Sequence, residues 1–230
     1  MSALPLRVGT SGFSYAAWKG TFYPERTPAK AMLREYASRL RTVEINNTFY
    51  KLPKKETFVE WASVVPEDFR FSLKASRFFT FSLKLAGAAE ALANFYDVAS
   101  PLGGKLGPLL VQLPPFLQRD HAALADFLAA VPKGKRVALE PHHPSWRDEA
   151  VYALMRRHDA AWVGVETDDA ALDAPDTASW RYLRLRKTKY KKAEISRWRT
   201  SLLADAREVF VYFKHEDLGV GPNLALALGG

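Results

Sequence analysis

Short apolar runs recur along the chain, each rich in valine, leucine, isoleucine and aromatic residues and each followed by a polar or charged residue. Strands buried on both faces of a parallel sheet have such near-continuous apolar sequences, whereas half-exposed strands alternate. The pattern therefore predicts eight parallel strands, with polar side chains gathered where the strands end. The runs and the polar residues that follow them occupy the segments 7–12, 42–50, 69–75, 107–115, 136–142, 161–169, 180–187 and 208–216.

The segments between these runs have the character of helices. In the segment 29–40, for example, Met32, Leu33 and Tyr36 recur at helical spacing. The segment 168–179 is different, because it is acidic, rich in alanine and without convincing periodicity, and we expect little or no helix there. Helices are also predicted in the segments 55–65, 85–99, 121–131, 148–158, 193–206 and 223–228.

Strands that alternate with helices in one chain predict the α/β class. We expect a compact, single-domain TIM (β/α)8 barrel over residues 1–230, with a weak or missing sixth helix. Such barrels usually have about 250 residues. The alternative is an open, doubly wound sheet. A sheet of that kind would need a glycine fingerprint after its first strand to bind a dinucleotide, and Gly9-Thr-Ser-Gly12 lacks that spacing.

The composition is that of an ordinary globular protein, with 48% apolar and 25% charged residues. No basic start leads into a long apolar run, and no stretch of roughly 18 apolar residues occurs, so we expect neither a signal peptide nor a membrane span. A cytoplasmic location is the resulting expectation. The chain has no cysteine, which excludes disulfides, thiolate catalysis and cysteine-ligated metals.

The net charge of +8 favours an anionic partner, either a phosphate-bearing small molecule or nucleic acid. The strongest sign of such a partner is the segment 184–192, in which six of nine residues are basic. Strand alternation puts Arg184 and Arg186 on the same side. Aromatic loops after the first three strands would provide stacking platforms beside this basic rim. The alternative is a solvated basic loop with packed aromatic residues on an indifferent surface.

Glu44 and Glu140 are the candidate catalytic residues, because the second and fifth strands would hold them across one cleft. Two carboxylates in a cleft can serve as acid and base or hold a cation. In the alternative interpretation, each forms a buried salt bridge with Lys74 or Arg184. We also expect an anion, with phosphate the first choice, to bind Lys74, Arg184 and Arg186, whose charges the carboxylates only partly offset.

No metal or other cofactor is predicted. Of the five histidines, His121 and His158 fall in predicted helices, on the far side of any site at the strand ends. The others show neither the HxH nor the HExxH spacing. A hard cation held by carboxylates stays open as an alternative.

Several longer motifs are distinctive, namely Gly9-Thr-Ser-Gly-Phe-Ser-Tyr15, Phe22-Tyr-Pro24, Thr42-Val-Glu-Ile-Asn-Asn-Thr-Phe-Tyr50, Phe69-Arg-Phe-Ser-Leu-Lys74, Gln112-Leu-Pro-Pro115 and the segment 140–146. In these motifs the chain resembles the YecE-like family, also known as domain of unknown function 72. The resemblance runs from Arg7 to about Leu228. It implies a TIM barrel whose polar strand ends meet in one cleft, and it implies little about chemistry, because the family's reaction is not established.

The chain matches the family pattern at some positions and departs from it at others. The match is closest at Glu44, Asn46, Asn47, Lys74, Gln112, Glu140, Ser145, Trp146 and Arg184. The family commonly has Thr-His in place of Thr80-Phe81, an arginine in place of His142, His-Gly in place of Arg186-Lys187, and two asparagines in place of Lys214-His215.

Together these features favour an enzyme that acts on a phosphate-bearing or nucleic-acid substrate at the C-terminal face of the barrel, such as a phosphoester hydrolase. One alternative is a non-catalytic nucleic-acid-binding module. Another is a sugar-processing barrel, since paired carboxylates amid tryptophans also suit glycosides. The oligomeric state is not indicated. The residues expected to bind substrate are Tyr15, Trp18, Asn46, Asn47, Tyr50, Lys74, Gln112, His142, Trp146, Asp168, Arg184, Arg186, Lys214 and His215.

Overall fold

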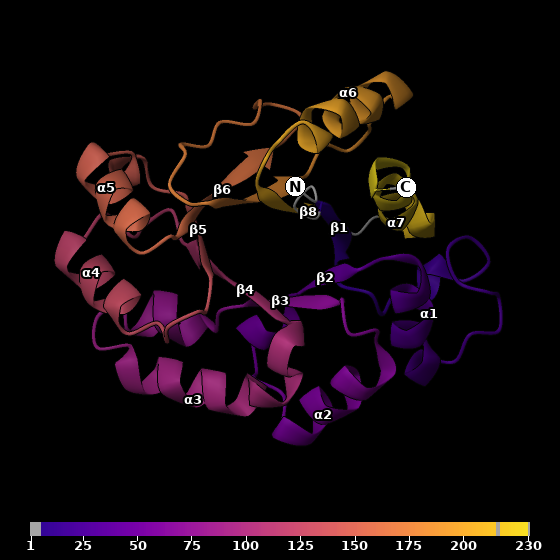
Figure 1. The fold of residues 1–230 in the computed structure, drawn as a ribbon, viewed down its shortest axis with the longest axis horizontal. Helices are drawn as coiled ribbons and strands as arrows, with labels where there is room; N and C mark the ends of the chain where they lie inside the picture. Colours follow the sequence, from indigo (N-terminus) through magenta and orange to yellow (C-terminus); the bar gives the residue numbers. More distant parts are fainter. Residues whose placement is uncertain (1–5, 215–216, 230) are drawn as a thin grey trace.

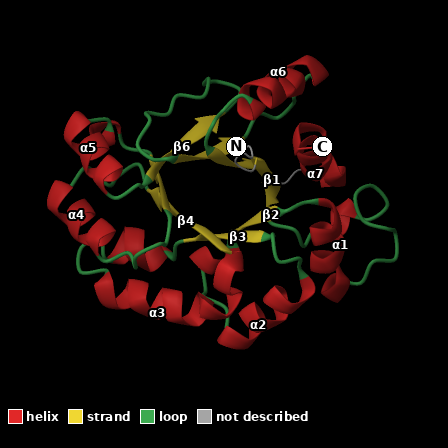
Figure 2. Cartoon of the chain, in the orientation of Figure 1, coloured by secondary structure: helices red, strands yellow, loops and turns green. Residues whose placement is uncertain are grey.

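The computed structural model describes residues 6–214 and 217–229, and its eight strands close into a barrel. Neighbouring strands are parallel all the way round, from β1–β2 to β8–β1. Figures 1 and 2 show the strands as an inner ring with the helices outside it. The predicted α/β TIM barrel is therefore confirmed. The strands are β1 (Leu6–Ser11), β2 (Thr42–Ile45), β3 (Arg70–Lys74), β4 (Leu106–Leu113), β5 (Val137–Pro141), β6 (Ala161–Glu166), β7 (Trp180–Leu185) and β8 (Glu208–Phe213).

Seven α-helices in the described residues cover the barrel from outside. Asp120 caps the N-terminus of α4, because its carboxylate accepts a hydrogen bond from the Ala123 backbone N–H at 2.9 Å. Asp148 caps α5 in the same way. The helices are α1 (Met32–Arg39), α2 (Lys55–Val64), α3 (Ala89–Ala99), α4 (His121–Ala129), α5 (Glu149–Arg157), α6 (Lys192–Leu203) and α7 (Val220–Gly229).

The connection between β6 and β7 is a loop without a helix, as predicted, and Figure 2 shows this part of the outer ring as loop. Thr177 fastens the loop: its hydroxyl accepts from the Trp162 backbone N–H and donates to the Ala160 carbonyl, both at 2.8 Å. A Cβ added to Gly164 would lie 3.0 Å from the Leu172 side chain. A glycine at this point of β6 therefore lets the loop lie directly on the sheet, where a helix would otherwise pack.

The third helix begins later than the predicted segment 85–99. It starts at Ala89, because Lys84 and Leu85 have positive φ angles of 50° and 73° that a right-handed helix does not accept. A π-helical turn over Phe78–Ser82 follows β3 instead. The chain thus turns sharply at the carboxyl end of β3 before the helix begins.

Side chains fill the barrel interior, as is usual for this architecture. Hydroxyl groups form hydrogen bonds in the middle layer of this interior. The Tyr212 hydroxyl lies 2.7 Å from the hydroxyl oxygens of both Thr42 and Ser72. Toward the amino ends of the strands, Trp180 and Phe210 pack with ring centroids 6.0 Å apart. Ionisable side chains lie beyond this packed interior at both ends of the barrel.

Candidate active site

Glu44 lies at the centre of a polar cluster at the carboxyl ends of the strands. Strand pairing places it level with Ser11 of β1 and Ser72 of β3, and its side chain is fully buried. Its Oε1 accepts hydrogen bonds from Ser11 Oγ at 2.6 Å and Arg184 Nη2 at 2.9 Å. Its Oε2 accepts one from the Tyr182 hydroxyl at 2.9 Å. Both carboxylate oxygens therefore have donors within the protein.

Glu140 lies in the same cluster, on β5. The strand register pairs it with Gln112 of β4, whose Nε2 donates to Oε1 at 2.8 Å. His142 Nε2 lies 3.2 Å from the same oxygen, and Arg184 Nη1 donates to Oε2 at 2.7 Å. Because Glu140 is only 4% exposed, the second carboxylate is also held by protein donors rather than by water.

Arg184 joins the two carboxylates, since one terminal nitrogen pairs with Glu44 and the other with Glu140. The interpretation in which both carboxylates form buried salt bridges is the arrangement found, with Arg184 rather than Lys74 as their common partner. Burial alone would lower the pKa of Arg184, but the two carboxylates raise it above its ordinary value. The guanidinium is thus a fixed positive charge at the centre of the cluster.

Both carboxyl groups stay ionised at neutral pH. Burial alone would raise the pKa of Glu44, but Arg184 and Arg186 outweigh burial and lower it below its ordinary value. Burial alone would likewise raise the pKa of Glu140, but the charge of Arg184 and the hydrogen bonds outweigh burial and lower this pKa to about 2. Neither group therefore holds a proton that it could donate as a general acid at neutral pH.

Lys74, at the end of β3, is the cation of the cluster without a carboxylate partner among the described residues. Its Nζ lies 4.3 Å from the centre of the Phe49 ring. Burial lowers the pKa of Lys74, and repulsion from Arg184 lowers it further. An anion arriving from solvent would stabilise the charged form of this lysine.

Arg186 lies just beyond Arg184 in the same cluster. Its Nη2 donates to Ser11 Oγ at 2.9 Å and lies 3.4 Å from Glu44 Oε1. Burial and the charge of Arg184 lower its pKa. The Nε atoms of both arginines and Oδ1 of Asn46 are buried without a hydrogen-bond partner among the described residues. Unsatisfied polar atoms of this kind are ready partners for water or a ligand.

A cavity of about 260 Å³ opens beside the cluster, between the loops that follow β1 and β2. Tyr15 lines it and donates from its hydroxyl to the Ser11 carbonyl at 3.0 Å. Burial, and then the charge of Glu44, raises the pKa of this phenol. Asn46 and Asn47 line the same space. Part of a ligand could therefore lie here, next to the ionised cluster.

Four aromatic residues, which we call the aromatic row, follow the rim over the loops after β2, β3 and β4. Their ring centroids are 5.1 Å apart for Phe49–Tyr50, 6.1 Å for Phe49–Phe81 and 5.4 Å for Phe81–Phe116. Tyr50, Phe81 and Phe116 are 76%, 45% and 59% exposed. Because Lys74 lies over Phe49, the row starts at the cationic cluster. Exposed rings beside cations are typical of surfaces that stack bases.

The sequence predicted stacking platforms in the loops after the first three strands, but of this row only Tyr50 was named as a binding residue, and Phe49, Phe81 and Phe116 were not. The signal that could have found them is their position in loops that directly follow strands, since those loops build the sites of TIM barrels. Their exposure depends on the tertiary structure, because phenylalanines in a loop are more often packed than exposed.

Two tryptophans expected to bind substrate are packed inside the loops instead. Trp18 is 1% exposed and packs against Phe22 and Tyr23. Trp146 is fully buried, and its Nε1 donates to the Leu117 carbonyl at 2.8 Å. Neither presents a surface to a ligand, because an indole of this size gains more from burial under the loops than from exposure.

The remaining predicted residues lie at the rim or outside the described part of the chain. The Asp168 carboxylate accepts from the Thr188 backbone N–H at 3.1 Å, which ties the loop after β6 to the loop after β7. The Lys214 backbone N–H donates to the Leu185 carbonyl at 3.2 Å. His215 lies outside the described residues.

The basic segment 184–192 is partly neutralised by Glu194 at the start of α6. Its carboxylate pairs with Lys187 Nζ at 2.5 Å and accepts from the Lys191 backbone N–H at 2.7 Å. The other lysine side chains of the segment are exposed. Apart from Arg184 and Arg186, which lie in the buried cluster, the segment is therefore an exposed basic stretch.

Among the described residues, no group of three or more histidine, aspartate or glutamate side chains could hold a metal ion. In the cluster itself, Arg184 lies between Glu44 and Glu140, where a shared cation would otherwise bind. In the part of the chain that the structure describes, no helix is both long enough and apolar enough to cross a membrane.

A closed barrel of eight parallel strands, with ionised side chains converging at their carboxyl ends, defines a TIM-barrel protein whose polar cluster lies where barrel sites are normally found. The chain belongs to the family described as protein of unknown function DUF72, which matches residues 7–229.

Individual relatives agree with this assignment. The chain is 33% identical over 115 residues to the UPF0759 protein YecE of Escherichia coli (strain K12), a match that spans 50% of the chain and 42% of that relative. It is similar to the solved structure of a DUF72 family protein from Thermotoga maritima, with a TM-score of 0.82, 26% identity and 97% of each chain covered. A DUF72 family protein from Enterococcus faecalis shares the fold, with a TM-score of 0.79, 23% identity, and 97% of this chain and 94% of that chain covered.

Proposed function

We propose that this protein is an enzyme that acts on a phosphate-bearing substrate, a nucleotide or a nucleic-acid strand, at the carboxyl ends of the barrel strands. The charge balance of the cluster carries the proposal: Lys74, Arg184 and Arg186 supply three positive charges against the two negative charges of Glu44 and Glu140. An uncompensated cation in a largely buried site is costly, and a substrate anion would offset it.

Lys74 and Arg186 are the residues proposed to contact the phosphate. Lys74 has no carboxylate partner in the described chain, and Arg186 offers the planar guanidinium that suits phosphate oxygens. Arg184 has both terminal nitrogens on carboxylates and is 5% exposed, so it attracts the phosphate through its charge without contacting it. Glu44 then has a positioning role, because it holds both arginines in place.

His142 is proposed as the general acid–base. Its side chain is 43% exposed, and Nε2 lies 3.2 Å from Glu140 Oε1. A carboxylate can only accept, so Nε2 carries the proton and a neutral ring keeps Nδ1 as its acceptor. An imidazole fixed in one tautomer by a carboxylate can take a proton from an attacking water or hydroxyl group. In this assignment Glu140 acts through His142 and does not react itself.

The aromatic row favours a substrate that carries a base close to its phosphate. Its rings begin beside Lys74 and continue over three loops of the rim. Stacking of a base on an exposed aromatic ring contributes about 1–3 kcal/mol and tolerates any sequence. A nucleotide with its phosphate on Lys74 and Arg186 would bring its base to these rings.

The alternatives differ in how they use the same groups. Glycoside hydrolysis needs one protonated and one ionised carboxyl group, whereas Glu44 and Glu140 are both ionised and share one arginine, so a sugar-processing role has less support. A non-catalytic nucleic-acid-binding module would use the cations and the aromatic row without any reaction at His142.

The test measures turnover and binding in the same variants. The probes are p-nitrophenyl phosphate, bis(p-nitrophenyl) phosphate and a fluorescein-labelled single-stranded oligonucleotide. General acid–base catalysis contributes typically 10²–10⁴-fold, so His142→Asn should lower turnover by about 100-fold or more and leave oligonucleotide affinity unchanged. Lys74→Met should weaken oligonucleotide binding instead.

His143→Asn is the matched control, because His143 Nδ1 interacts with Ser145 Oγ at 2.8 Å rather than with Glu140. Equal turnover in wild type and His142→Asn would overturn the role of His142. Oligonucleotide binding that Lys74→Met weakens, without turnover of any probe by wild type, would favour the binding module over the enzyme.

A further inference from the structure

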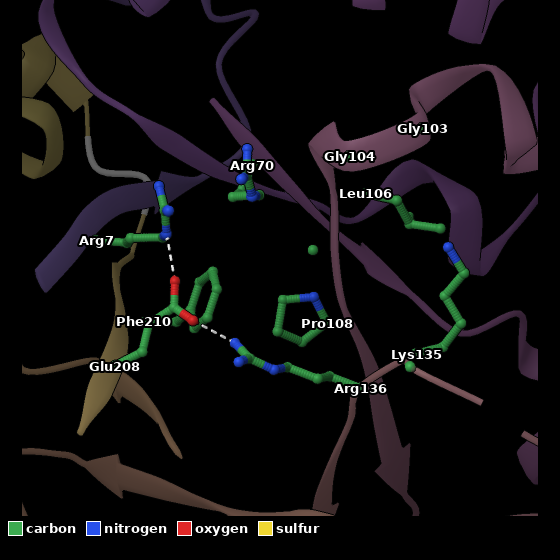
Figure 3. Close-up of a pocket in the computed structure, with 12 residues that line it drawn as sticks. Arg7, Arg70, Gly103, Gly104, Leu106, Pro108, Lys135, Arg136, Glu208 and Phe210 are labelled. Atoms are coloured by element: carbon green, nitrogen blue, oxygen red, sulfur yellow. Dashed lines mark hydrogen bonds and ion pairs between the residues drawn. The ribbon is translucent and has the colours of Figure 1, made fainter. Parts of the chain in front are cut away.

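A cavity of about 490 Å³ lies at the opposite end of the barrel, among the amino ends of the strands. Arg7, Arg70, Lys135, Arg136, Glu208 and Phe210 line it, and Figure 3 shows their side chains. Its volume falls in the range of roughly 300–1,000 Å³ that is usual for small-molecule sites. This face of a TIM barrel does not normally carry catalysis, so the cavity is separate from the cluster around Arg184.

The lining of the cavity is strongly unbalanced in charge. Four cationic side chains face a single carboxylate, that of Glu208, which leaves a net charge of three positive units. Glu208 already forms ion pairs with two of the cations. Its Oε1 accepts a hydrogen bond from Arg7 Nε at 2.6 Å, and its Oε2 pairs with Arg136 Nη1. In Figure 3, Glu208 lies between these two arginines. Arg70 and Lys135 have no carboxylate partner in the described part of the chain.

Other acidic residues nearby do not correct the imbalance. Glu67 pairs with Lys105 at 3.3 Å, and Asp68 pairs with Arg41 at 3.3 Å. The carboxylates of Glu67 and Asp68 are 87% and 64% exposed, so solvent screens them. Burial and then the charge of Arg7 lower the pKa of Arg70, in spite of the opposing attraction of Glu208, Asp68 and Glu67. The lining cations therefore repel one another in the absence of a ligand.

The walls of the cavity leave space and donors for a ligand. Gly103, Gly104, Gly107 and Gly134 form much of its lining and fill none of it with side chains. Arg70 uses its Nη1 on the Glu67 and Phe69 carbonyls, and Arg7 uses its Nη1 on the Asp68 carbonyl. Arg70 is therefore held through Nη1 alone and Arg7 through Nη1 and Nε, which leaves Nη2 of both guanidinium groups without a hydrogen-bond partner among the described residues.

We propose that this cavity binds a small anion with two or more linked phosphate groups, such as inorganic pyrophosphate or the polyphosphate part of a nucleotide. Three guanidinium groups around one space match the several oxygens of linked phosphates, because each is a fixed charge whose remaining N–H groups can donate to phosphate oxygens. Lys135 adds a mobile charge at the edge. The site is independent of the substrate site proposed at the other end, and its ligand acts as an effector or a stabiliser.

Isothermal titration calorimetry of the full chain with inorganic pyrophosphate tests this proposal, with sodium chloride holding the ionic strength constant. Arg70→Gln and Lys135→Gln should each weaken the Kd about tenfold or more, the loss expected for a charge-assisted hydrogen bond. Arg34→Gln removes the same charge from an exposed position of α1 and is the matched control. It should bind pyrophosphate as tightly as wild type does. Circular dichroism checks whether Arg70→Gln is folded. Lys135 is exposed, so Lys135→Gln keeps the test independent of any folding defect.

The variant Lys74→Met separates this site from the one at the carboxyl ends. Saturable pyrophosphate binding that persists in Lys74→Met and is weakened by Arg70→Gln in that background supports the amino-end site. Unchanged affinity in both Arg70→Gln and Lys135→Gln, or loss of all saturable binding in Lys74→Met, would overturn it. Citrate that binds as tightly as pyrophosphate would overturn the assignment to phosphate, because the cavity would then recognise charge alone.

Discussion

The two ends of the barrel both concentrate ionisable side chains, but they compensate charge in different ways. At the carboxyl ends, Arg184 is shared by Glu44 and Glu140, and every carboxylate oxygen has a donor inside the protein. At the amino ends, Glu208 faces four cations around an open cavity. The first arrangement is complete except for one surplus cation, whereas the second has a large surplus.

The difference is the basis for proposing a preorganised site at one end of the barrel and a site that its ligand completes at the other. Fixed donors and charges need no reorganisation when a substrate arrives, which is the condition for electrostatic catalysis. A surplus of partly exposed cations instead makes binding the step that relieves repulsion, as expected of an effector site.

Arg184→Met should have the largest effect on stability. It would leave Glu44 and Glu140 as buried charges without their common cation, so we expect the free energy of unfolding to fall by about 3–5 kcal/mol. Urea denaturation at pH 7 measures the change. The control Arg34→Gln, at an exposed position of α1, should stay within about 0.5 kcal/mol of wild type. A loss for Arg184→Met no larger than the control's would mean that the carboxylates do not depend on Arg184.

Acid should remove a smaller part of the stability through Glu140. Folding lowers the pKa of this carboxyl group from 4.5 to about 2, so its contribution is present above pH 4.5 and is lost as pH falls toward 2. By linkage this amounts to about 3 kcal/mol at most. Urea unfolding across this range should show a shallower acid-induced decline for Glu140→Gln than for wild type. Parallel pH profiles for the two proteins would contradict this account of the cluster.

Glu208→Gln should have the smallest of the three effects, a loss of about 2 kcal/mol, because its hydrogen bonds to Arg7 and Arg136 are charge-assisted but less buried than the Arg184 pairs. Saturating pyrophosphate should restore part of this loss, since a ligand that binds only the folded state stabilises it. Thermal unfolding with and without pyrophosphate measures both. A larger loss than that of Arg184→Met would make the amino end the more preorganised of the two.

Much of the fold follows from local sequence patterns. The apolar runs predicted the strands, because buried parallel strands need continuous apolar residues. The acidic segment 168–179, which has no helical periodicity, predicted that no helix lies between β6 and β7. The predicted start of α3 was wrong, because Lys84 and Leu85 adopt positive φ angles that nothing in their side chains requires. Such angles arise from the path that the chain takes around the barrel.

The residues of the site could be predicted from the sequence, whereas the ion pairs and packing contacts between them could be predicted less well. Lys74 and Arg184 both stand near strand ends, and only the stagger of the strands decides which of them lies between the carboxylates. The burial of Trp18 and Trp146 likewise depends on how the loops fold over them. Sequence spacing does not contain this information, because the contacts join residues far apart in the chain.

The amino-end cavity was not predicted, although the sequence contains a sign of it. Arg7, Arg70, Arg136 and Glu208 each stand directly before or at the start of an apolar run. In a parallel barrel all strands begin at one end, so these positions must lie together there. The polar residues that follow the runs lie together at the other end for the same reason. Attention to strand beginnings as well as strand ends would have found them.

The triad of Glu44, Arg184 and Glu140 also constrains the order in which the chain can fold. Glu44 belongs to the first half of the barrel, whereas two of its donors, Tyr182 and Arg184, come from β7. A folding intermediate made of β1–β4 would therefore hold this carboxylate with Ser11 and near Lys74, but without Arg184 and Arg186, its ion-pair partners. The two ion pairs of the triad form only when the seventh strand docks, so we expect the two half-barrels to fold as one cooperative unit.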